Sequence, residues 1–364
     1  MLENLLPTRQ RENVAKSLGK EAIEEQLTTI LRVSGESALH QIRDQARTIA
    51  PTLAMEKQFQ TLDRLIAALL CSKPASLATS VARAYASGEP YDRTRLPLLD
   101  AAFATLRSES WPDRSDRFAH LPAFYNVAFF DAYFSNYIEG TMFPIDQAIR
   151  IVFENEIPAN RPDDAHDVIG TYRLVASQDE MSRRPENFED FLDLLKRRHA
   201  TIMQARPTLL PGQFKITNNP AGNTVFVAPE MVVGTLRQGF ERYQALEEPF
   251  ARALFMMLLI TEVHPFADGN GRIARVMMNA EQIAAGQTRI FIPSVYRNEY
   301  MGSLKRLTHH HQANALVKVM SQAQLFVHRI DFTELNSARQ MLAKHNAFDD
   351  PSDDVKLKMP ESQF

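Results

Sequence analysis

The sequence has only one cysteine, Cys71, among its 364 residues. A single cysteine excludes an internal disulfide framework and is compatible with a reducing compartment. Because Cys71 follows the apolar run LIAALL in a predicted helix, we expect its thiol to be buried by packing rather than to act as a nucleophile.

Features of secretion and of membrane insertion are also missing. The first twenty residues, MLENLLPTRQRENVAKSLGK, lack the basic start and the apolar run of a signal peptide. The most apolar stretch, ALFMMLLITEV, is shorter than the about 20 apolar residues that a bilayer requires. We therefore expect a soluble, cytoplasmic protein in which this stretch is a core helix.

No excess of one charge sign is present, since the formal net charge is −3. We find no basic stripe and no clear helix-turn-helix pattern, so neither direct nucleic-acid binding nor attraction to an anionic membrane is indicated. Internal repeats are absent as well. Hydrophobic residues make up 45% and charged residues 23%, which is ordinary for a globular protein with a sizeable core.

Most of the chain has helical periodicity, with apolar residues three and four positions apart from about Glu21 to Leu106. A polar, proline-punctuated stretch at 108–122 is a plausible boundary. We expect a helical N-terminal region at 1–115 and a helical core at 116–330. A C-terminal helix or mobile acidic tail is expected at 331–364.

One segment departs from this helical pattern. PGQFKITNNPAGNTVFVAPE, at 211–230, contains two alternating segments on either side of a turn rich in Asn, Pro and Gly. This pattern predicts a small β-hairpin at 212–229.

The stretch TEVHPFADGNGRIARVMMN, at 261–279, combines flexible and charged residues between two apolar helical runs. Its Gly-Asn-Gly turn at 269–271 leaves backbone N–H groups free at a predicted helix N-terminus, where they attract phosphate oxygens. Arg272 and Arg275 lie near that end and are able to neutralise further phosphate charge. The pattern indicates an anion cradle.

Two titratable residues flank this cradle. Asp268 offers a hard oxygen ligand that suits Mg²⁺ bridging protein and phosphate. His264 has an ordinary pKa near neutrality and so suits a general base acting on a hydroxyl. Taken alone, these residues leave phosphate chemistry and a purely structural loop as open alternatives.

The segment HPFADGNGRIAR resembles the motif of the Fic family over its full length: His, any residue, Phe, any residue, an acid, Gly-Asn-Gly-Arg, two residues, Arg. The resemblance implies an all-α fold, a Fic-type helical bundle with a small β-hairpin flap. It also implies transfer of AMP from ATP to a protein hydroxyl. The intact motif favours this AMP transfer over phosphorylation or phosphocholine transfer.

The resemblance implies a role for each motif residue. His264 would deprotonate a Ser, Thr or Tyr hydroxyl of the target, Phe266 would anchor the loop, and Asp268 would hold Mg²⁺ on the α- and β-phosphates. The remaining motif residues would bind the phosphates of ATP: Gly269, Asn270, Gly271, Arg272 and, at the γ-phosphate, Arg275.

Two further segments resemble parts of Fic proteins. The predicted hairpin would be the flap that holds a target segment by strand addition, with Ile216 and Phe226 as clamp residues. Its alternative role is only to cover the core. After the motif, Arg297 and Tyr300 are candidates for contacts near the adenine or ribose, although aromatic residues at helical spacing are usually core. The histidines at 309–311 point in different directions on a helix, which favours surface residues over a metal site.

SNYIEG, at 135–140, places Ser135 and Glu139 on one helix face. It resembles the Fic inhibitory motif in its class II arrangement, in which an inhibitory helix at about 124–140 precedes the catalytic motif in the same chain. Glu139 would pair with Arg275 and prevent it from holding the γ-phosphate. Helix capping is the alternative explanation of this pattern.

The resulting hypothesis is an autoinhibited protein adenylyltransferase that uses ATP and Mg²⁺ and modifies an unidentified target protein, and also itself. One alternative is an enzyme of opposite direction, in which Glu139 positions water to remove AMP. Another is a nucleotide-responsive regulatory binding protein with little turnover, although His264 argues against a pure binder. Homo-oligomerisation is left open.

Overall fold

The computed structural model describes residues 1–6, 17–71, 76–119, 122–220 and 224–361. These residues form two units, Met1–Arg93 and Thr94–Phe364. Among them the protein is helical and contains no sheet, which confirms the all-α prediction; an isolated β-bridge joins Ser115 and Gln287. None of the described helices is long and apolar enough to cross a membrane.

The first unit is a small helical cluster. It contains the 3₁₀ helix η1 (Leu2–Leu5) and the helices α1 (Gly19–Ile49), α2 (Glu56–Leu69) and α3 (Ser80–Ala86). Gly35 has a φ of 74° and divides α1 into two helical segments, a conformation that glycine adopts without steric cost. The buried carboxylate of Glu24 accepts hydrogen bonds from the N–H groups of Ala78 and Thr79, which fixes the start of α3.

The prediction that Cys71 is buried was wrong. The helix α2 ends before Cys71, whose φ of 53° turns the chain and leaves the residue exposed. The helical periodicity of the preceding run therefore does not extend to this position.

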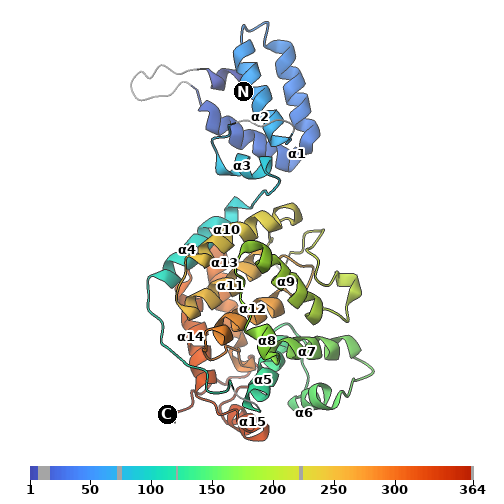
Figure 1. The fold of residues 1–364 in the computed structure, drawn as a ribbon, viewed down its shortest axis with the longest axis vertical. Coiled ribbons are helices and arrows are strands. Elements are labelled where there is room, and N and C mark those ends of the chain that lie inside the picture. The colour runs from blue at the N-terminus through green and yellow to red at the C-terminus, as the bar shows by residue number, and fades with distance from the viewer. Residues whose placement is uncertain (7–16, 72–75, 120–121, 221–223, 362–364) are drawn as a thin grey trace. The chain divides into compact units, whose positions relative to one another are not determined.

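The second unit holds the remaining helices (Figure 1). Its α-helices are α4 (Leu96–Arg107), α5 (Ala123–Ile138), α6 (Ile145–Ile149), α7 (Pro162–Val175), α8 (Gln178–Met181), α9 (Phe188–Ile202), α10 (Val232–Gln244), α11 (Pro249–Val263), α12 (Asn270–Ala284), α13 (Arg297–His310), α14 (Asn314–His328) and α15 (Leu335–Lys344). Short connecting helices are η2 (Arg93–Arg95), the π-helix η3 (Arg150–Glu154), η4 (Pro207–Leu209), η5 (Pro229–Met231) and η6 (Ser294–Tyr296).

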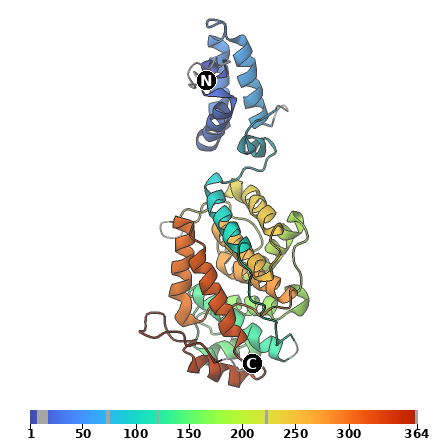
Figure 2. The same cartoon turned by 90° about the vertical axis from the view of Figure 1, so that its left-hand side faces the viewer.

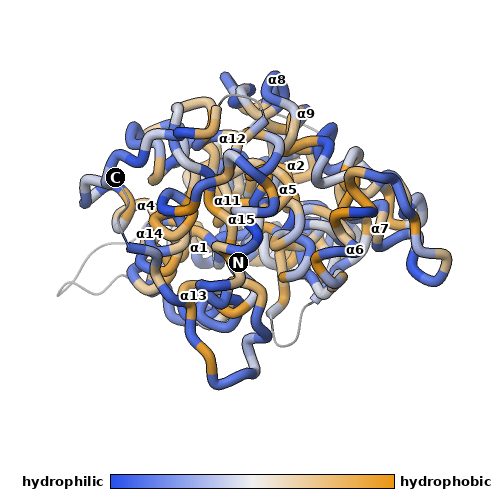
Figure 3. Tube along the Cα trace, turned by 90° about the horizontal axis from the view of Figure 1, so that it is seen from below, coloured by the Kyte–Doolittle hydropathy of each residue, from blue (hydrophilic) through white to orange (hydrophobic). Residues whose placement is uncertain are grey.

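Helix α11 is the centre of the main hydrophobic core. It is apolar on nearly all sides, as expected of a helix enclosed by others, and it packs on α12, α10 and α4. In Figure 3 the α11 segment lies inside an outer layer of more hydrophilic chain. Because α4 contributes Leu98, Leu99 and Ala102 to this core, the division between the units falls at Arg93, ahead of the boundary expected at 115.

A second, aromatic cluster surrounds α5. Phe134 stacks on Phe291 and on Phe348, with ring centroids 5.0 and 5.3 Å apart. Leu342 of α15 is buried in the same cluster, so the C-terminal part of the chain packs against α5. Figure 2 shows the orange and red C-terminal helices along one side of this unit.

The β-hairpin predicted at 212–229 is not visible: the residues described there form no paired strands. Their backbone groups find other partners. The N–H of Lys215 donates to the carbonyl of Pro265 at 2.9 Å, and Arg95 donates to the carbonyl of Val225. The residues described there, here called the flap segment (residues 212–220 and 224–229), thus form backbone hydrogen bonds with other parts of the fold.

Close packing of α7 on α9 supplies a test of this fold. A Cβ at Gly170 would lie 2.7 Å from the carbonyl oxygen of Thr201 and 3.0 Å from that of Ile202, so Gly170→Ala must push the two helices apart. We expect a loss of about 1–3 kcal/mol in the free energy of unfolding. Trp111 is the only tryptophan in the sequence and packs against Phe250 in a tilted arrangement, so its fluorescence during denaturation reports on the second unit.

The matched control is Gly302→Ala in α13, where a Cβ would meet nothing within 4 Å. Alanine is the better helix former, so this variant should gain up to about 1 kcal/mol. Equal stability changes in the two variants would contradict the assigned α7–α9 packing.

Candidate active site

The motif loop joins α11 to α12, which pack side by side. His264 ends α11 in the left-handed conformation (φ 54°, ψ 60°), and Gly269 (φ 75°) directly precedes α12. These two turns reverse the chain between the helices. A positive φ carries a steric cost for histidine, which has a Cβ atom, and no such cost for glycine.

His264 lies beneath the flap segment. Its ring stacks on Phe226 with centroids 3.8 Å apart, and Nδ1 lies 3.3 Å from the carbonyl oxygen of Thr261. A carbonyl only accepts, so this contact places the proton on Nδ1 and leaves the Nε2 lone pair free. Burial lowers the pKa of His264 to about 4, and the nearby Lys215 ammonium adds to the effect. The imidazole is therefore neutral at pH 7 and able to accept a proton.

The side chain of Asn270 binds the backbone of the motif loop and does not point toward solvent. Its buried side chain accepts from the N–H of Phe266 and donates to the carbonyl of the same residue, both at 2.9 Å. Phe266 is fully buried, as predicted for a loop anchor. Asn270 can therefore contribute only its backbone to an anion cradle.

The N-terminus of α12 has no side-chain cap. Its exposed backbone dipoles favour an anion at this point. The carboxylate of Glu139, from the end of α5, lies there: a Cβ at Gly271 would be 2.1 Å from Glu139 Oε1. Only glycine lets an anionic group approach the helix backbone so closely.

Arg275 is 2% exposed and is bound at the end of α5. Its Nε donates to Ser135 Oγ at 2.9 Å, and its Nη2 donates to the carbonyl of Ser135 at 2.8 Å and to Glu139 Oε1 at 2.7 Å. Burial lowers the pKa of Arg275, but the Glu139 carboxylate and the Tyr300 hydroxyl outweigh burial and raise it above its ordinary value. The structure thus brings Ser135, Glu139 and Arg275 together.

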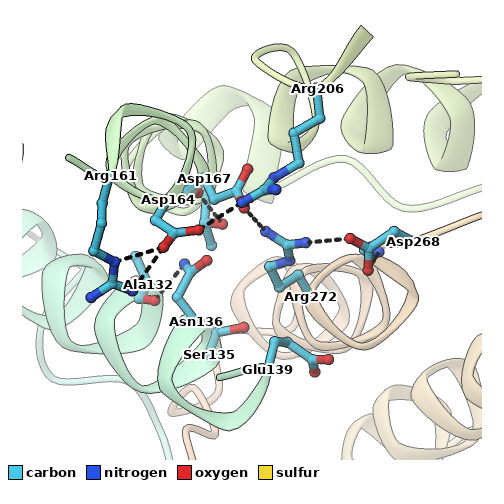
Figure 4. A network of polar contacts seen from close by, with 12 residues as sticks. Ala132, Ser135, Asn136, Glu139, Arg161, Asp164, Asp167, Arg206, Asp268 and Arg272 are labelled. Atoms are coloured by element: carbon cyan, nitrogen blue, oxygen red, sulfur yellow. Dashed lines mark hydrogen bonds and ion pairs between the residues drawn. The ribbon is translucent and has the colours of Figure 1, made fainter. Parts of the chain in front are cut away.

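Arg272 belongs to a separate network of alternating charges (Figure 4). Its Nη1 lies 2.7 Å from Asp167 Oδ2, and its Nη2 lies 3.7 Å from Asp268 Oδ2. Asp167 in turn accepts from Arg206 at 2.9 Å. The network continues from Arg206 to Asp164 at 2.7 Å and from Asp164 to Arg161 at 2.8 Å.

Two donor atoms of Arg272, Nε and Nη1, are buried and have no hydrogen-bond partner among the described residues, although Nη1 lies at ion-pair distance from Asp167 Oδ2. A buried donor without a partner carries a desolvation penalty, which a phosphate oxygen would relieve. The donor set at the start of α12 therefore fits a phosphate chain.

The surroundings of Asp268 suit a metal ion that enters the site already bound to the phosphates of a nucleotide. Its side chain is 51% exposed, and Oδ1 accepts from the N–H of Gly269 at 2.6 Å. No group of three or more His, Cys, Asp or Glu side chains among the described residues could hold a metal ion. Mg²⁺ is commonly bound by one or two carboxylates together with substrate phosphates, so a single carboxylate suits a magnesium–nucleotide complex and not a resident ion.

The more distant candidate residues lie in different surroundings. Ile216 is 77% exposed, so it is available to a partner, whereas Phe226 covers His264. Arg297 donates from Nε to the carbonyl of Ile138 at 3.1 Å, and Tyr300 is buried beside Arg275. Both residues therefore lie near the end of α5, close to the Glu139–Arg275 ion pair. The histidines at 309–311 are exposed, in agreement with their prediction as surface residues.

Sequence reasoning missed several residues that hold the loop. They are His199 on α9, Asp167 on α7, Arg206 after α9, and Lys215 and Asn219 in the flap segment. All of them are distant in sequence from the motif. The packing of α7 and α9 against α12 places Asp167 and His199 there, and the flap segment brings Lys215 and Asn219.

Residues 189–281 match the sequence model of the Fic/DOC family. This stretch of the chain is therefore similar to a Fic domain. The matched range runs from α9 through most of α12 and so includes the whole motif loop.

Named relatives of the Fic domain are also found. The protein adenylyltransferase fic-1 of Caenorhabditis briggsae is 28% identical over 174 residues, which cover 46% of this chain and 34% of the relative. Its namesake from Caenorhabditis elegans is 25% identical over 225 residues, which cover 58% and 44%. The chain thus spans less than half the length of these two relatives.

The fold resembles the crystal structure of a Fic domain containing signaling protein from Bacteroides thetaiotaomicron. The TM-score is 0.50 and the identity 18%, over 67% of this chain and 97% of the other. This comparison agrees with the all-α Fic-type helical bundle.

The environment of His264 predicts that the stability of the second unit is sensitive to acid. Because burial holds its pKa near 4, against about 6.5 when unfolded, the unfolded state binds more protons between these values. Stability is then complete above pH 6.5 and falls as the pH drops toward 4. Between pH 7.5 and 5, His264 should account for a loss of about 2 kcal/mol in the free energy of unfolding.

The measurement is urea denaturation at both pH values, followed by Trp111 fluorescence, for wild type and His264→Gln. Glutamine does not titrate, so the acid-induced loss should be smaller in this variant by about the same 2 kcal/mol. An identical loss in both proteins would show that the folded protein does not keep His264 neutral.

Proposed function

We propose that this chain is an autoinhibited protein adenylyltransferase, which transfers AMP from ATP to a hydroxyl group of a target protein and of itself. One observation carries the proposal: a neutral imidazole with a free Nε2 stands beside an uncapped helix N-terminus flanked by two buried arginines. The names of the relatives support it.

The proposed reaction follows from these positions. The target hydroxyl gives its proton to His264 Nε2, and its oxygen attacks the α-phosphorus of ATP. The bond from that phosphorus to the bridging oxygen breaks, and diphosphate leaves. The N–H groups at Gly271 and Arg272 and the Nε of Arg272 hold the phosphates. Asp268 would hold Mg²⁺, which would supply neutralisation of phosphate charge when bound.

Autoinhibition follows from the place of Glu139. Its carboxylate takes the position over Gly271 that a phosphate would need, and it also pairs with Arg275, the residue assigned to the γ-phosphate. Two negative groups cannot share the cradle without strong repulsion. Nucleotide binding in the productive pose therefore requires Glu139 to leave.

The target is proposed to bind along the flap segment. Ile216 and Val225 are exposed apolar residues on this segment, at 77% and 66% of their full exposure. An extended partner backbone beside them would reach the ring of His264 at Phe226. The chemistry of the site requires only a Ser, Thr or Tyr hydroxyl.

A second candidate function is removal of AMP from a modified protein. Glu139 remains 32% exposed although it pairs with Arg275, so one side of its carboxylate faces solvent beside the phosphate cradle. A carboxylate in that position is able to orient a water molecule toward phosphorus. Loss of AMP release in Glu139→Gly would support this direction.

The central prediction concerns Glu139→Gly. Removing the carboxylate frees both the α12 N-terminus and Arg275, so AMP incorporation should rise at least about tenfold, which corresponds to about 1.4 kcal/mol. Incubation with Mg²⁺ and ATP labelled at the α-phosphate, followed by counting of covalent label on the protein, measures the effect.

Two further variants control the result. His264→Ala in the Glu139→Gly background should lose about a hundredfold or more of the label, as expected of a general base. Glu156→Gly removes a carboxylate from an exposed ion pair with Arg150 and should match wild type. Label that is no higher in Glu139→Gly than in wild type would argue against the proposed brake.

A further inference from the structure

His199 on α9 is a fully buried histidine outside the motif, and both of its ring nitrogens are used. The N–H of Gly212, at the start of the flap segment, donates to Nδ1 at 2.9 Å. Since an N–H only donates, the ring proton lies on Nε2, which donates to the carbonyl of Asp268 at 2.9 Å. His199 therefore joins the flap segment to the residue assigned to the metal.

The same ring also supports the loop from below. It stacks on Phe266 with centroids 3.6 Å apart and planes 4° from parallel. A Cβ at Gly269 would lie 3.3 Å from His199 Nε2 and 2.8 Å from Met203 Sδ. The ring thus lies against the left-handed turn that starts α12.

Two other contacts join the flap segment to the loop. The N–H of Lys215 donates to the carbonyl of Pro265 at 2.9 Å, and the side chain of Asn219 donates to that of Phe266 at 2.7 Å. The flap segment and the loop therefore share hydrogen bonds along the stretch from Pro265 to Asp268. We therefore expect a displacement of the flap segment to move the motif loop as well.

We propose that His199 is a positioning residue, which holds the Asp268 turn and the flap segment in one fixed arrangement, so that nucleotide and target are aligned together. This inference rests on the proposed function for what the site aligns. Its structural part, the coupling of two segments through one ring, stands on the contacts alone.

The first test is hydrogen exchange of His199→Phe without nucleotide. Phenylalanine preserves the stack on Phe266 but leaves the Gly212 N–H and the Asp268 carbonyl without partners. Amides at 212–219 and 266–272 should exchange about tenfold faster or more, whereas those of α10 keep their wild-type rates. Uniform acceleration across the second unit, or none in these two segments, would overturn the proposal.

The matched control is His328→Phe. His328 is a partly buried histidine whose Nδ1 lies 3.0 Å from Thr288 Oγ1, away from the loop. Its variant should leave exchange at 212–219 and 266–272 unchanged. Acceleration of these segments in both variants would show that they respond to any loss of a histidine contact, and the coupling would be refuted.

The second test is calorimetric binding of ATP in the Glu139→Gly background. With Mg²⁺ present, His199→Phe should weaken binding about 10–100-fold, the range for residues that orient a metal ligand. With a chelator present the loss should be much smaller. His199→Gln offers a donor near the Nε2 position and should recover part of the affinity. Equal losses with and without Mg²⁺, or no recovery by glutamine, would contradict the positioning role.

The two tests separate this inference from the proposed function. Hydrogen exchange needs neither nucleotide nor transfer, so it decides the coupling by itself. If Glu139→Gly binds magnesium–ATP but incorporates no AMP, the proposed function fails while the exchange result for His199 still stands.

Discussion

The arrangement of the site depends on the burial of one guanidinium group, that of Arg275. A cation that is 2% exposed must be matched by acceptors inside the protein, because an unpaired buried charge is strongly unfavourable. Ser135 and Glu139 supply those acceptors from the last turn of α5. The ion pair thereby fixes α5 against α12, and the aromatic cluster around Phe134 supports α5 from its other side.

The motif loop has no regular secondary structure of its own, so its carbonyl groups must be satisfied from elsewhere. Donors come from three directions: Lys215 and Asn219 in the flap segment, His199 on α9 and Asn270 on α12. The loop is rigid because separate elements converge on it. A motif of this kind depends on the fold around it as much as on its own residues.

The parts of the site that could be predicted from the sequence are local ones. His264 to Arg275 is a contiguous motif, and Ser135 and Glu139 are four residues apart on one helix, so their pattern is visible without a structure. The helices were predictable from apolar periodicity, and α5 ends at Ile138, close to the end expected at about 140.

The remaining features depend on distant contacts. Asp167 and His199 meet the motif only because α7 and α9 pack against α12, and no spacing along the chain encodes that packing. The predicted hairpin is not visible among the described residues, and an alternating sequence is compatible with any extended chain. Whether it pairs with itself or with a neighbouring loop depends on which partner lies within reach.

Because Glu139 lies over Gly271, the protein concentration and the nucleotide concentration affect the occupancy of the cradle differently. A carboxylate carried by the same chain is a ligand with a constant effective concentration, which dilution of the protein does not change. Under the proposed function, a nucleotide would compete with it only through its own concentration and affinity. The occupancy of the cradle would then be independent of the protein concentration, and it would change with the level of nucleotide or with any contact that moves the end of α5.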